Sequence, residues 1–196
     1  MRAFFAVDLP ESLASAVAAA QAPFADTSGV NPIDPEQAHV TLKFCGEVGD
    51  VGDEPADGDA PPTIDDVVAA GERAVDRAGS VPFDCAVGGL GVFPSREYVS
   101  VVWAGVGAGA AELTALHEAL EAETTAIGVD PADHAFTPHV TLARVENATG
   151  AEAVRRALDA EDPEVGTFSV DEIRLIESTP TPSGSEYDTV KEFRLD

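Results

Sequence analysis

The tetrapeptide His-Val-Thr-Leu occurs at residues 39–42 and again at residues 139–142 of this chain of 196 residues. The chain has four histidines, and two of them begin these copies. Residues two apart on a β-strand point to the same face of the sheet, so each histidine shares a face with the following threonine. Valine and leucine take the opposite, core-facing side. A buried imidazole or hydroxyl without a partner costs about 1–3 kcal/mol, so the histidine face must look onto a polar groove.

The sequence around each copy repeats one order of elements: strand, helix, His-Val-Thr-Leu strand, helix, strand. Alternating and β-branched stretches predict strands at 2–8, 38–48, 81–94, 97–106, 138–145, 166–178 and 185–195, and amphipathic stretches predict helices at 11–24, 63–79, 110–128 and 149–160. Thr63 and Asp66 have the spacing of a capping box at the start of the second helix. Residues 49–62, rich in Gly, Asp and Pro, predict an acidic loop.

This order predicts an α+β fold with a weak internal duplication. We expect a single domain over residues 1–196, with sequence halves at approximately 1–94 and 95–196. The domain would have two pseudo-duplicated lobes, each a mainly antiparallel sheet with helices on the outside, on either side of a central cleft. Ligand sites favour such clefts, so the two histidine faces would meet there.

Two imidazoles and two hydroxyls in one cleft suit transfer at phosphorus. His39 and His139 would form an acid/base pair, since one imidazole accepts a proton while the other, protonated, donates one. Thr41 and Thr141 would donate hydrogen bonds to the phosphate oxygens. Two alternatives stay open: a structural echo of duplication, and metal binding. Zinc catalysis needs about three protein ligands, and neither copy has a third His or Cys at ligand spacing, so we expect no metal and no cofactor.

The motifs resemble those of the 2H phosphoesterases, which carry two H-x-[ST]-x motifs, and particularly the RNA 2′,3′-cyclic phosphodiesterases, also described as 2′-5′ RNA ligases. The matching stretches are MRAFFAVDLP (1–10), HVTLKFCGEV (39–48), GVFPSREYVSVVWAGV (91–106), FTPHVTLARV (136–145) and IESTPTPSGSEYDTVKEF (176–193). The resemblance implies a two-lobed fold with a metal-independent site that opens a 2′,3′-cyclic phosphate to a 2′-phosphate.

The resemblance also implies roles for the motif residues. His139 would activate water and His39 would protonate the leaving 3′ oxygen, although a pseudo-symmetric site leaves the reverse assignment open. The partner would be RNA with a 2′,3′-cyclic phosphate end, such as a tRNA fragment, or a cyclic nucleotide. The alternatives are 2′-5′ ligation, hydrolysis of a small cyclic nucleotide, and a non-catalytic module that binds RNA ends. We expect a monomer.

Strand parity gives two further candidate substrate contacts. Lys43 falls on the His39 face, and Arg144 falls on the face opposite His139 unless the strand bends. The same parity puts Cys45 on the His39 face and Phe44 toward the core. His117 is predicted to be a residue of the helix surface. Cys45 and Cys85 have no zinc-binding spacing and are expected to be reduced thiols.

The charge is strongly acidic, with 36 Asp and Glu against 11 Lys and Arg, a net charge of −25. Acidic residues spread along a chain that keeps a core-forming pattern favour a halophilic protein over one that merely avoids polyanions. On this interpretation, residues 49–62 are a salt-adapted insertion. No run of 18 apolar residues exists, and acids follow soon after the N-terminus, so we expect a cytoplasmic protein without a membrane span.

Molar KCl should stabilise this protein, because salt screens the mutual repulsion of its carboxylates. We expect the midpoint of thermal unfolding, followed by circular dichroism, to rise steadily from dilute buffer to molar KCl. Equal midpoints across that range would contradict the halophilic interpretation.

Overall fold

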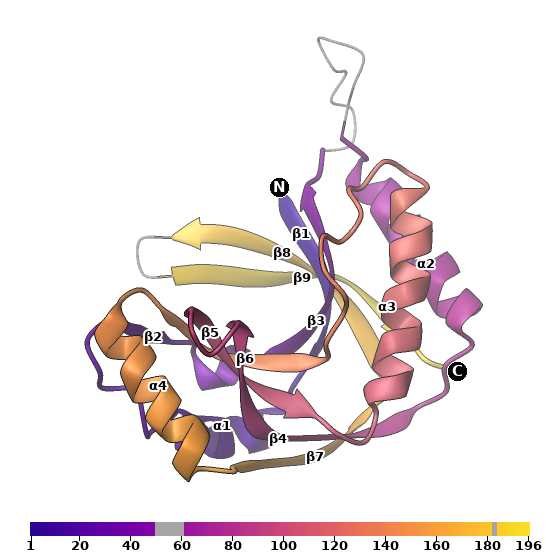
Figure 1. Cartoon of the computed structure of the whole chain (residues 1–196). Coiled ribbons are helices and arrows are strands. Elements are labelled where there is room, and N and C mark those ends of the chain that lie inside the picture. Colours follow the sequence, from indigo (N-terminus) through magenta and orange to yellow (C-terminus); the bar gives the residue numbers. More distant parts are fainter. Residues whose placement is uncertain (50–60, 182–183) are drawn as a thin grey trace.

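The computed structural model describes residues 1–49, 61–181 and 184–196 as an α+β fold (Figure 1). Its strands are β1 (Arg2–Asp8), β2 (Val30–Pro32), β3 (His39–Glu47), β4 (Phe83–Pro94), β5 (Val99–Val106), β6 (His139–Val145), β7 (Glu164–Val170), β8 (Glu172–Thr181) and β9 (Gly184–Arg194). Its helices are α1 (Ala14–Gln21), α2 (Ile64–Ala78), α3 (Ala110–Thr125) and α4 (Ala148–Ala160), with short 3₁₀ turns at Glu11–Leu13 and Pro35–Gln37. In these described residues, no helix is both long and apolar enough to cross a membrane.

The strands form one sheet with the order β7-β4-β5-β6-β3-β1-β8-β9, while β2 pairs with β6 from outside this path. All pairs are antiparallel, and the two motif strands, β3 and β6, are neighbours at the centre, where Val40 is opposite Val140. The predicted α+β class is confirmed. A separate sheet was expected in each lobe, but the strands of both lobes form one continuous, curled sheet. The two motifs therefore lie side by side within that sheet.

The helices divide between the two halves of the sheet (Figure 1). Helices α2 and α3 pack against each other, α3 on β3 and α2 on β9, whereas α1 contacts β6 and β7, and α4 contacts β5. Each half of the sheet contains strands from both halves of the sequence. Strand β4, from the first half of the sequence, lies in the same half of the sheet as β6, whereas β8 and β9, from the second half of the sequence, lie beside β1. The predicted division of the sequence near residue 94 therefore reflects the repeated order of elements and does not coincide with the two halves of the sheet. The assignment of a single domain to residues 1–196 stays a prediction. Most of the predicted acidic loop, 50–60, lies outside the described residues.

The strand predicted over residues 166–178 is two strands, which is a correction. Strand β7 ends at Val170 and pairs with β4 at one edge, whereas β8 begins at Glu172 and pairs with β1 and β9 in the other half. Asp171 alone connects them, so the sheet must curl until its two halves approach. Val170 and Ile173 are both buried although they are three residues apart, which breaks the alternation of a single strand.

The alternation of β3 also breaks, at a bulge after the first motif. Along the β1–β3 ladder, Thr41 pairs with Ala6 and Lys43 pairs with Phe5, so Leu42 is the extra residue. Leu42 and Lys43 are both buried, and Phe44 then turns to the face of the histidine. A β-bulge moves the side chains that follow it to the other face, which is why strand parity predicts the wrong face for residues 43–45. A second register shift follows between Phe44 and Gly46.

Strand β6 has an equivalent bulge. Thr141 pairs with Trp103 and Ala143 pairs with Val102, so Leu142 is the extra residue. Leu142 and Ala143 are both buried, and Arg144 turns to the face of His139. Strict alternation places Arg144 opposite His139 unless the strand bends, and this bulge provides the bend. It lies at the same position relative to the motif as the bulge in β3.

Helix side chains bind the carbonyl groups of both bulge residues. The Leu42 carbonyl accepts a hydrogen bond from His117 Nδ1 of α3 at 2.8 Å, and the Leu142 carbonyl accepts one from Gln21 Nε2 of α1 at 2.9 Å. His117 also stacks on Phe136, with ring centroids 4.2 Å apart. The prediction that His117 is a helix-surface residue is wrong, because its ring is half-buried between the bulge and Phe136.

Lys43 lies inside the protein, on the side of α3. Its side chain is 2% exposed, and its ammonium group lies 2.7 Å from Glu121 Oε2 and donates to the Asp130 carbonyl at 2.7 Å. Burial alone would raise the pKa of Glu121, but hydrogen bonds from Lys43 and the Ala132 amide outweigh it and hold that pKa below its ordinary value. The predicted contact between Lys43 and substrate is wrong, because this lysine joins β3 to α3.

Both cysteines are free thiols in the core. Cys45 is 6% exposed, because the bulge turns it away from the histidine face, and burial raises the pKa of its thiol to about 12. Burial, together with the charge of Glu112, raises the pKa of the Cys85 thiol to about 11. The predicted position of Cys45 on the His39 face is wrong for the same reason as that of Lys43.

The two lysines of this chain provide a matched test of the fold. Lys43→Met should lower the free energy of unfolding by about 2 kcal/mol or more, because it leaves Glu121 partly buried without its cation. Lys191→Met should change it little, since Lys191 lies 3.7 Å from Glu72 with both side chains about half exposed. Urea unfolding followed by circular dichroism measures both. Equal effects of the two substitutions would contradict a structural role for Lys43.

Candidate active site

The antiparallel register of β3 and β6 brings the two motifs together. With Val40 opposite Val140, each histidine lies across from the threonine of the other motif: His39 toward Thr141, and His139 toward Thr41. The valines are fully buried, whereas all four polar residues are partly exposed on the other face. The predicted division of each motif into a polar and an apolar face is confirmed for these positions.

Each imidazole is held by the backbone two residues before it. His39 Nδ1 lies 2.8 Å from the Gln37 carbonyl, and His139 Nδ1 lies 2.6 Å from the Thr137 carbonyl. A carbonyl only accepts, so Nδ1 must carry the hydrogen in both rings. The tautomer leaves Nε2 of each neutral imidazole with a free lone pair, available to take up or release a proton.

Aromatic rings fix the orientation of both imidazoles. The ring centroid of His39 lies 5.1 Å from that of Phe4 and 5.5 Å from that of Tyr187. The centroid of His139 lies 4.9 Å from that of Phe93 and 5.9 Å from that of Trp103. Each imidazole therefore has two aromatic neighbours, which restrict the ring and remove part of it from water.

This burial lowers the pKa of both histidines below the ordinary value of 6.5. For His39, desolvation dominates, and the hydrogen bond to the Gln37 carbonyl and the nearby Asp8 carboxylate oppose it. For His139, desolvation again dominates, the bond to Thr137 opposes it, and positive charge on His39 lowers the pKa further. The two rings therefore differ: a carboxylate favours the charged form of His39, and His39 disfavours the charged form of His139.

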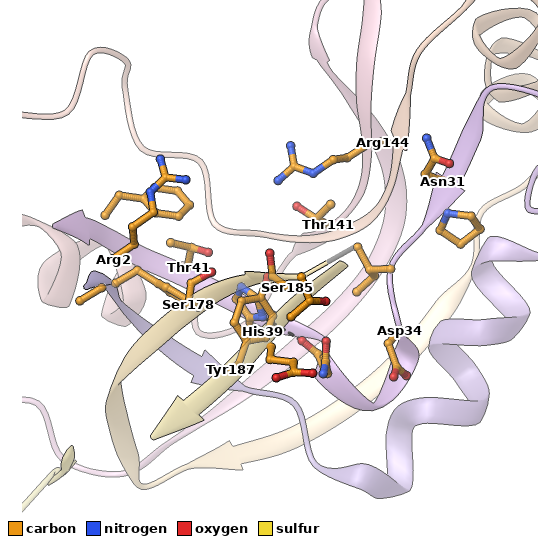
Figure 2. A pocket seen from close by; sticks show the side chains of 18 of the residues that line it. Arg2, Asn31, Asp34, His39, Thr41, Thr141, Arg144, Ser178, Ser185 and Tyr187 are labelled. Carbon is orange, nitrogen blue, oxygen red and sulfur yellow. Dashed lines mark hydrogen bonds between the residues drawn. The ribbon is translucent and has the colours of Figure 1, made fainter. Parts of the chain in front are cut away.

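A cavity of about 1050 Å³ opens beside the motifs. Figure 2 shows Thr41 and Ser178 on one side of it and Thr141 and Arg144 on the other, with His39 beside Tyr187. His39, Thr41, Thr141 and Arg144 all line this cavity, so four of the six residues predicted for the site meet there. His139 contacts Phe93 and Trp103 and is not part of the lining formed by the described residues. Lys43 is buried on the side of α3.

Sequence reasoning missed several residues of the cavity. Phe44 enters it because of the bulge, and Arg2, Asp34, Ser178 and Tyr187 come from β1, from the turn before β3, and from β8 and β9. Only the order of strands in the sheet brings these segments to the motifs. Among the described residues, no group of three His, Cys, Asp or Glu side chains is arranged to hold a metal ion.

Comparison with known proteins identifies the family. The family model of the 2′-5′ RNA ligase superfamily matches residues 9–181. A protein of Methanothermobacter thermautotrophicus named RNA 2′,3′-cyclic phosphodiesterase is 32% identical, with 100% of this chain and 99% of that protein covered. A protein of Aeropyrum pernix with the same name is 36% identical, over 83% of this chain and 84% of its own length.

Solved structures share the fold. The crystal structure of TT0787 of Thermus thermophilus has a TM-score of 0.76 and 29% identity, covering 100% of this chain and 98% of that one. Escherichia coli LigT complexed with 3′-AMP has a TM-score of 0.75 at 23% identity, covering 99% and 97%. This chain belongs to the 2′-5′ RNA ligase superfamily, and the resemblance to 2H phosphoesterases found in its sequence is confirmed.

The electrostatic coupling of the two imidazoles can be measured directly. Removing the charge of His39 by His39→Gln should raise the pKa of His139 toward its ordinary value, as followed by pH titration of the imidazole proton shifts in NMR spectra. His134→Gln, in an exposed loop, is the control and should leave the pKa of His139 unchanged. An unchanged pKa in His39→Gln would show that the rings do not interact.

Proposed function

We propose that this protein hydrolyses RNA 2′,3′-cyclic phosphate ends to 2′-phosphate ends without a metal ion, with His39 and His139 as the acid/base pair. The observation that carries the proposal is that the imidazoles of His39 and His139, on adjacent strands, have the same hydrogen-bond pattern. Each has Nδ1 bound to a backbone carbonyl and Nε2 left for proton transfer. The names of the relatives, RNA 2′,3′-cyclic phosphodiesterase, support this substrate and this reaction.

The arrangement suits in-line attack of water on the cyclic phosphate. Neutral Nε2 of one imidazole takes a proton from water as the new oxygen–phosphorus bond forms. The bond from phosphorus to the 3′ oxygen breaks, and the other ring, protonated at Nε2, gives its proton to that oxygen. Thr41 and Thr141 donate hydrogen bonds to the non-bridging oxygens, where negative charge accumulates, and the Arg144 guanidinium adds a positive charge.

The surroundings of the two rings favour one assignment of roles. Asp8 on β1 lies across from His39, whereas Gly105 on β5 lies across from His139. The Asp8 carboxylate stabilises an imidazolium at His39, although Arg174, 2.9 Å from that carboxylate, shares its charge. We therefore assign His39 as the acid that protonates the 3′ oxygen, and His139 as the base that activates water.

The proposal includes the setting of the reaction. The acidic composition supports action in a concentrated salt solution, and we place that action in the cytoplasm. The protein would act as a monomer, and tRNA fragments with cyclic phosphate ends are candidate substrates.

Hydrolysis of a 2′,3′-cyclic nucleotide in EDTA tests the proposal. We expect turnover to the 2′-phosphate, a bell-shaped dependence on pH, and a loss of about 10²–10⁴-fold in kcat for His39→Ala and for His139→Ala. Phosphorus NMR identifies the product, and His134→Ala is the control variant.

Three results would count against it. Binding without turnover would favour a module that only binds RNA ends. Loss of activity in EDTA alone would contradict the metal-free mechanism. A rate that is flat from about pH 5 to pH 9 would contradict the use of one neutral and one protonated imidazole.

A further inference from the structure

A second guanidinium lines the cavity at some distance from the two motifs. Arg2, at the start of β1, lies on the same face of that strand as Phe4, whose ring centroid is 5.1 Å from that of His39. Figure 2 shows Arg2 and Ser178 on the Thr41 side of the cavity. The proposed proton transfers and the proposed contacts to the cyclic phosphate make no use of this arginine.

Arg2 is too far along the sheet to share the phosphate that Thr41 would hold. Thr41 pairs with Ala6 of β1, and Arg2 comes four residues before Ala6. At a rise of about 3.3 Å per residue, the two positions lie roughly 13 Å apart along the strand. A mononucleotide with one phosphate cannot occupy both positions, whereas an RNA chain has a further phosphate at each internal linkage.

The neighbouring strands leave the Arg2 side chain available to an anion. Ser178 of β8 is directly across from Arg2 on one side, and Glu47 of β3 is across from it on the other. Arg2 Nε lies 3.3 Å from Glu47 Oε1, with the two side chains 63% and 73% exposed, and so exposed an ion pair contributes little. A guanidinium has five N–H donors, so Arg2 can keep this contact and still donate a fork of hydrogen bonds to a phosphate. The Ser178 hydroxyl adds another donor.

The size of the cavity also fits a chain better than a single nucleotide. Its volume of about 1050 Å³ lies at the upper end of the range of about 300–1,000 Å³ that is usual for small-molecule sites. A cyclic mononucleotide with its phosphate at the motifs would leave the Arg2 end of this volume to solvent.

We infer that Arg2 and Ser178 form a second anion subsite, which binds an internal phosphate of an RNA chain while the cyclic phosphate at the end of that chain lies at the motifs. This inference rests on the proposed function. It makes the end of an oligonucleotide, rather than a cyclic mononucleotide, the preferred substrate. A contact of this kind also persists in concentrated salt, where long-range attraction is screened.

Substrates of different length test the inference: 2′,3′-cyclic AMP and an adenylate trinucleotide with a 2′,3′-cyclic phosphate end, both at one KCl concentration. Arg2→Gln should raise KM for the trinucleotide about 10-fold, because it removes a hydrogen bond between charged groups, with kcat nearly unchanged. KM for 2′,3′-cyclic AMP should change less than about 2-fold, because its one phosphate lies at the motifs. Arg2→Lys should restore part of the trinucleotide binding, since it keeps the charge without the fork.

A trinucleotide whose internal linkages are neutral methylphosphonates tests whether Arg2 recognises charge. KM of the wild-type protein for this substrate should rise about 10-fold, and Arg2→Gln should add no further increase. Arg96→Gln is the matched control, because Arg96 is 55% exposed, is paired with Asp159, and lies outside the lining formed by the described residues.

Equal increases in KM for the mononucleotide and the trinucleotide in Arg2→Gln would overturn the inference, since Arg2 would then act on the motifs through Phe4. An unchanged KM for both substrates would overturn it as well. So would an effect of Arg2→Gln that stays as large with the neutral linkages.

Calorimetric binding of an adenylate trinucleotide that ends in a 2′-phosphate separates this inference from the proposed function. If the wild-type protein turns over neither substrate, the proposed function fails. Trinucleotide binding that weakens about 10-fold in Arg2→Gln, with binding of adenosine 2′-phosphate unchanged, then still supports the subsite. If the wild-type protein binds the trinucleotide no more tightly than adenosine 2′-phosphate, the subsite is overturned, whatever the catalytic activity.

Discussion

The antiparallel contact of β3 and β6 at Val40 and Val140 sets the geometry on which the site depends. An antiparallel pair has local two-fold symmetry, so two copies of one motif placed there present the same side chains in opposite directions. Each histidine is then across from the threonine of the other motif, and both threonines line the cavity. Parallel strands, or motifs in separate sheets, would not produce this crossed arrangement from the same eight residues.

The matched bulges and carbonyl contacts hold this arrangement in place. Each bulge turns the third residue after the threonine into the cavity, and helices α3 and α1 bind the bulge carbonyls through His117 and Gln21. The backbone carbonyls of Gln37 and Thr137 hold the imidazoles in one tautomer. Local backbone geometry therefore orients the two imidazoles, and distant elements fix that geometry.

Much of the fold follows from the sequence alone. Alternation predicts the motif strands and their polar faces, and Thr63 with Asp66 predicts the capping box that begins α2. Alternation fails where register depends on a partner strand. Nothing in the sequence at residues 42–43 signals a bulge, so alternation predicts the wrong faces for Lys43 and Phe44. The sequence does not predict the break between β7 and β8 at Asp171, because strand-like residues continue on both sides of it.

The cavity carries more negative than positive side chains, although the substrate proposed for it is an anion. Asp34, Glu146 and Glu186 line it together with Arg2 and Arg144, so carboxylates outnumber guanidinium groups. In dilute buffer this excess of one negative charge disfavours the approach of an anion. In concentrated salt the Debye length falls to about 3 Å, and only groups in direct contact with the phosphate affect its binding. The proposed site is consistent with that regime, because Thr41, Thr141 and Arg144 line the cavity and would act on a phosphate by direct contact.

The most direct test of the paired-histidine account is a crystal structure with the 2′,3′-cyclic vanadate ester of a nucleoside, which mimics the five-coordinate transition state. The account predicts that Nε2 of His39 and Nε2 of His139 both lie within about 3.2 Å of vanadate oxygens. Both Nδ1 atoms should keep their bonds to the Gln37 and Thr137 carbonyls. Vanadate bound to only one of the two rings, or bound outside this cavity, would contradict the account.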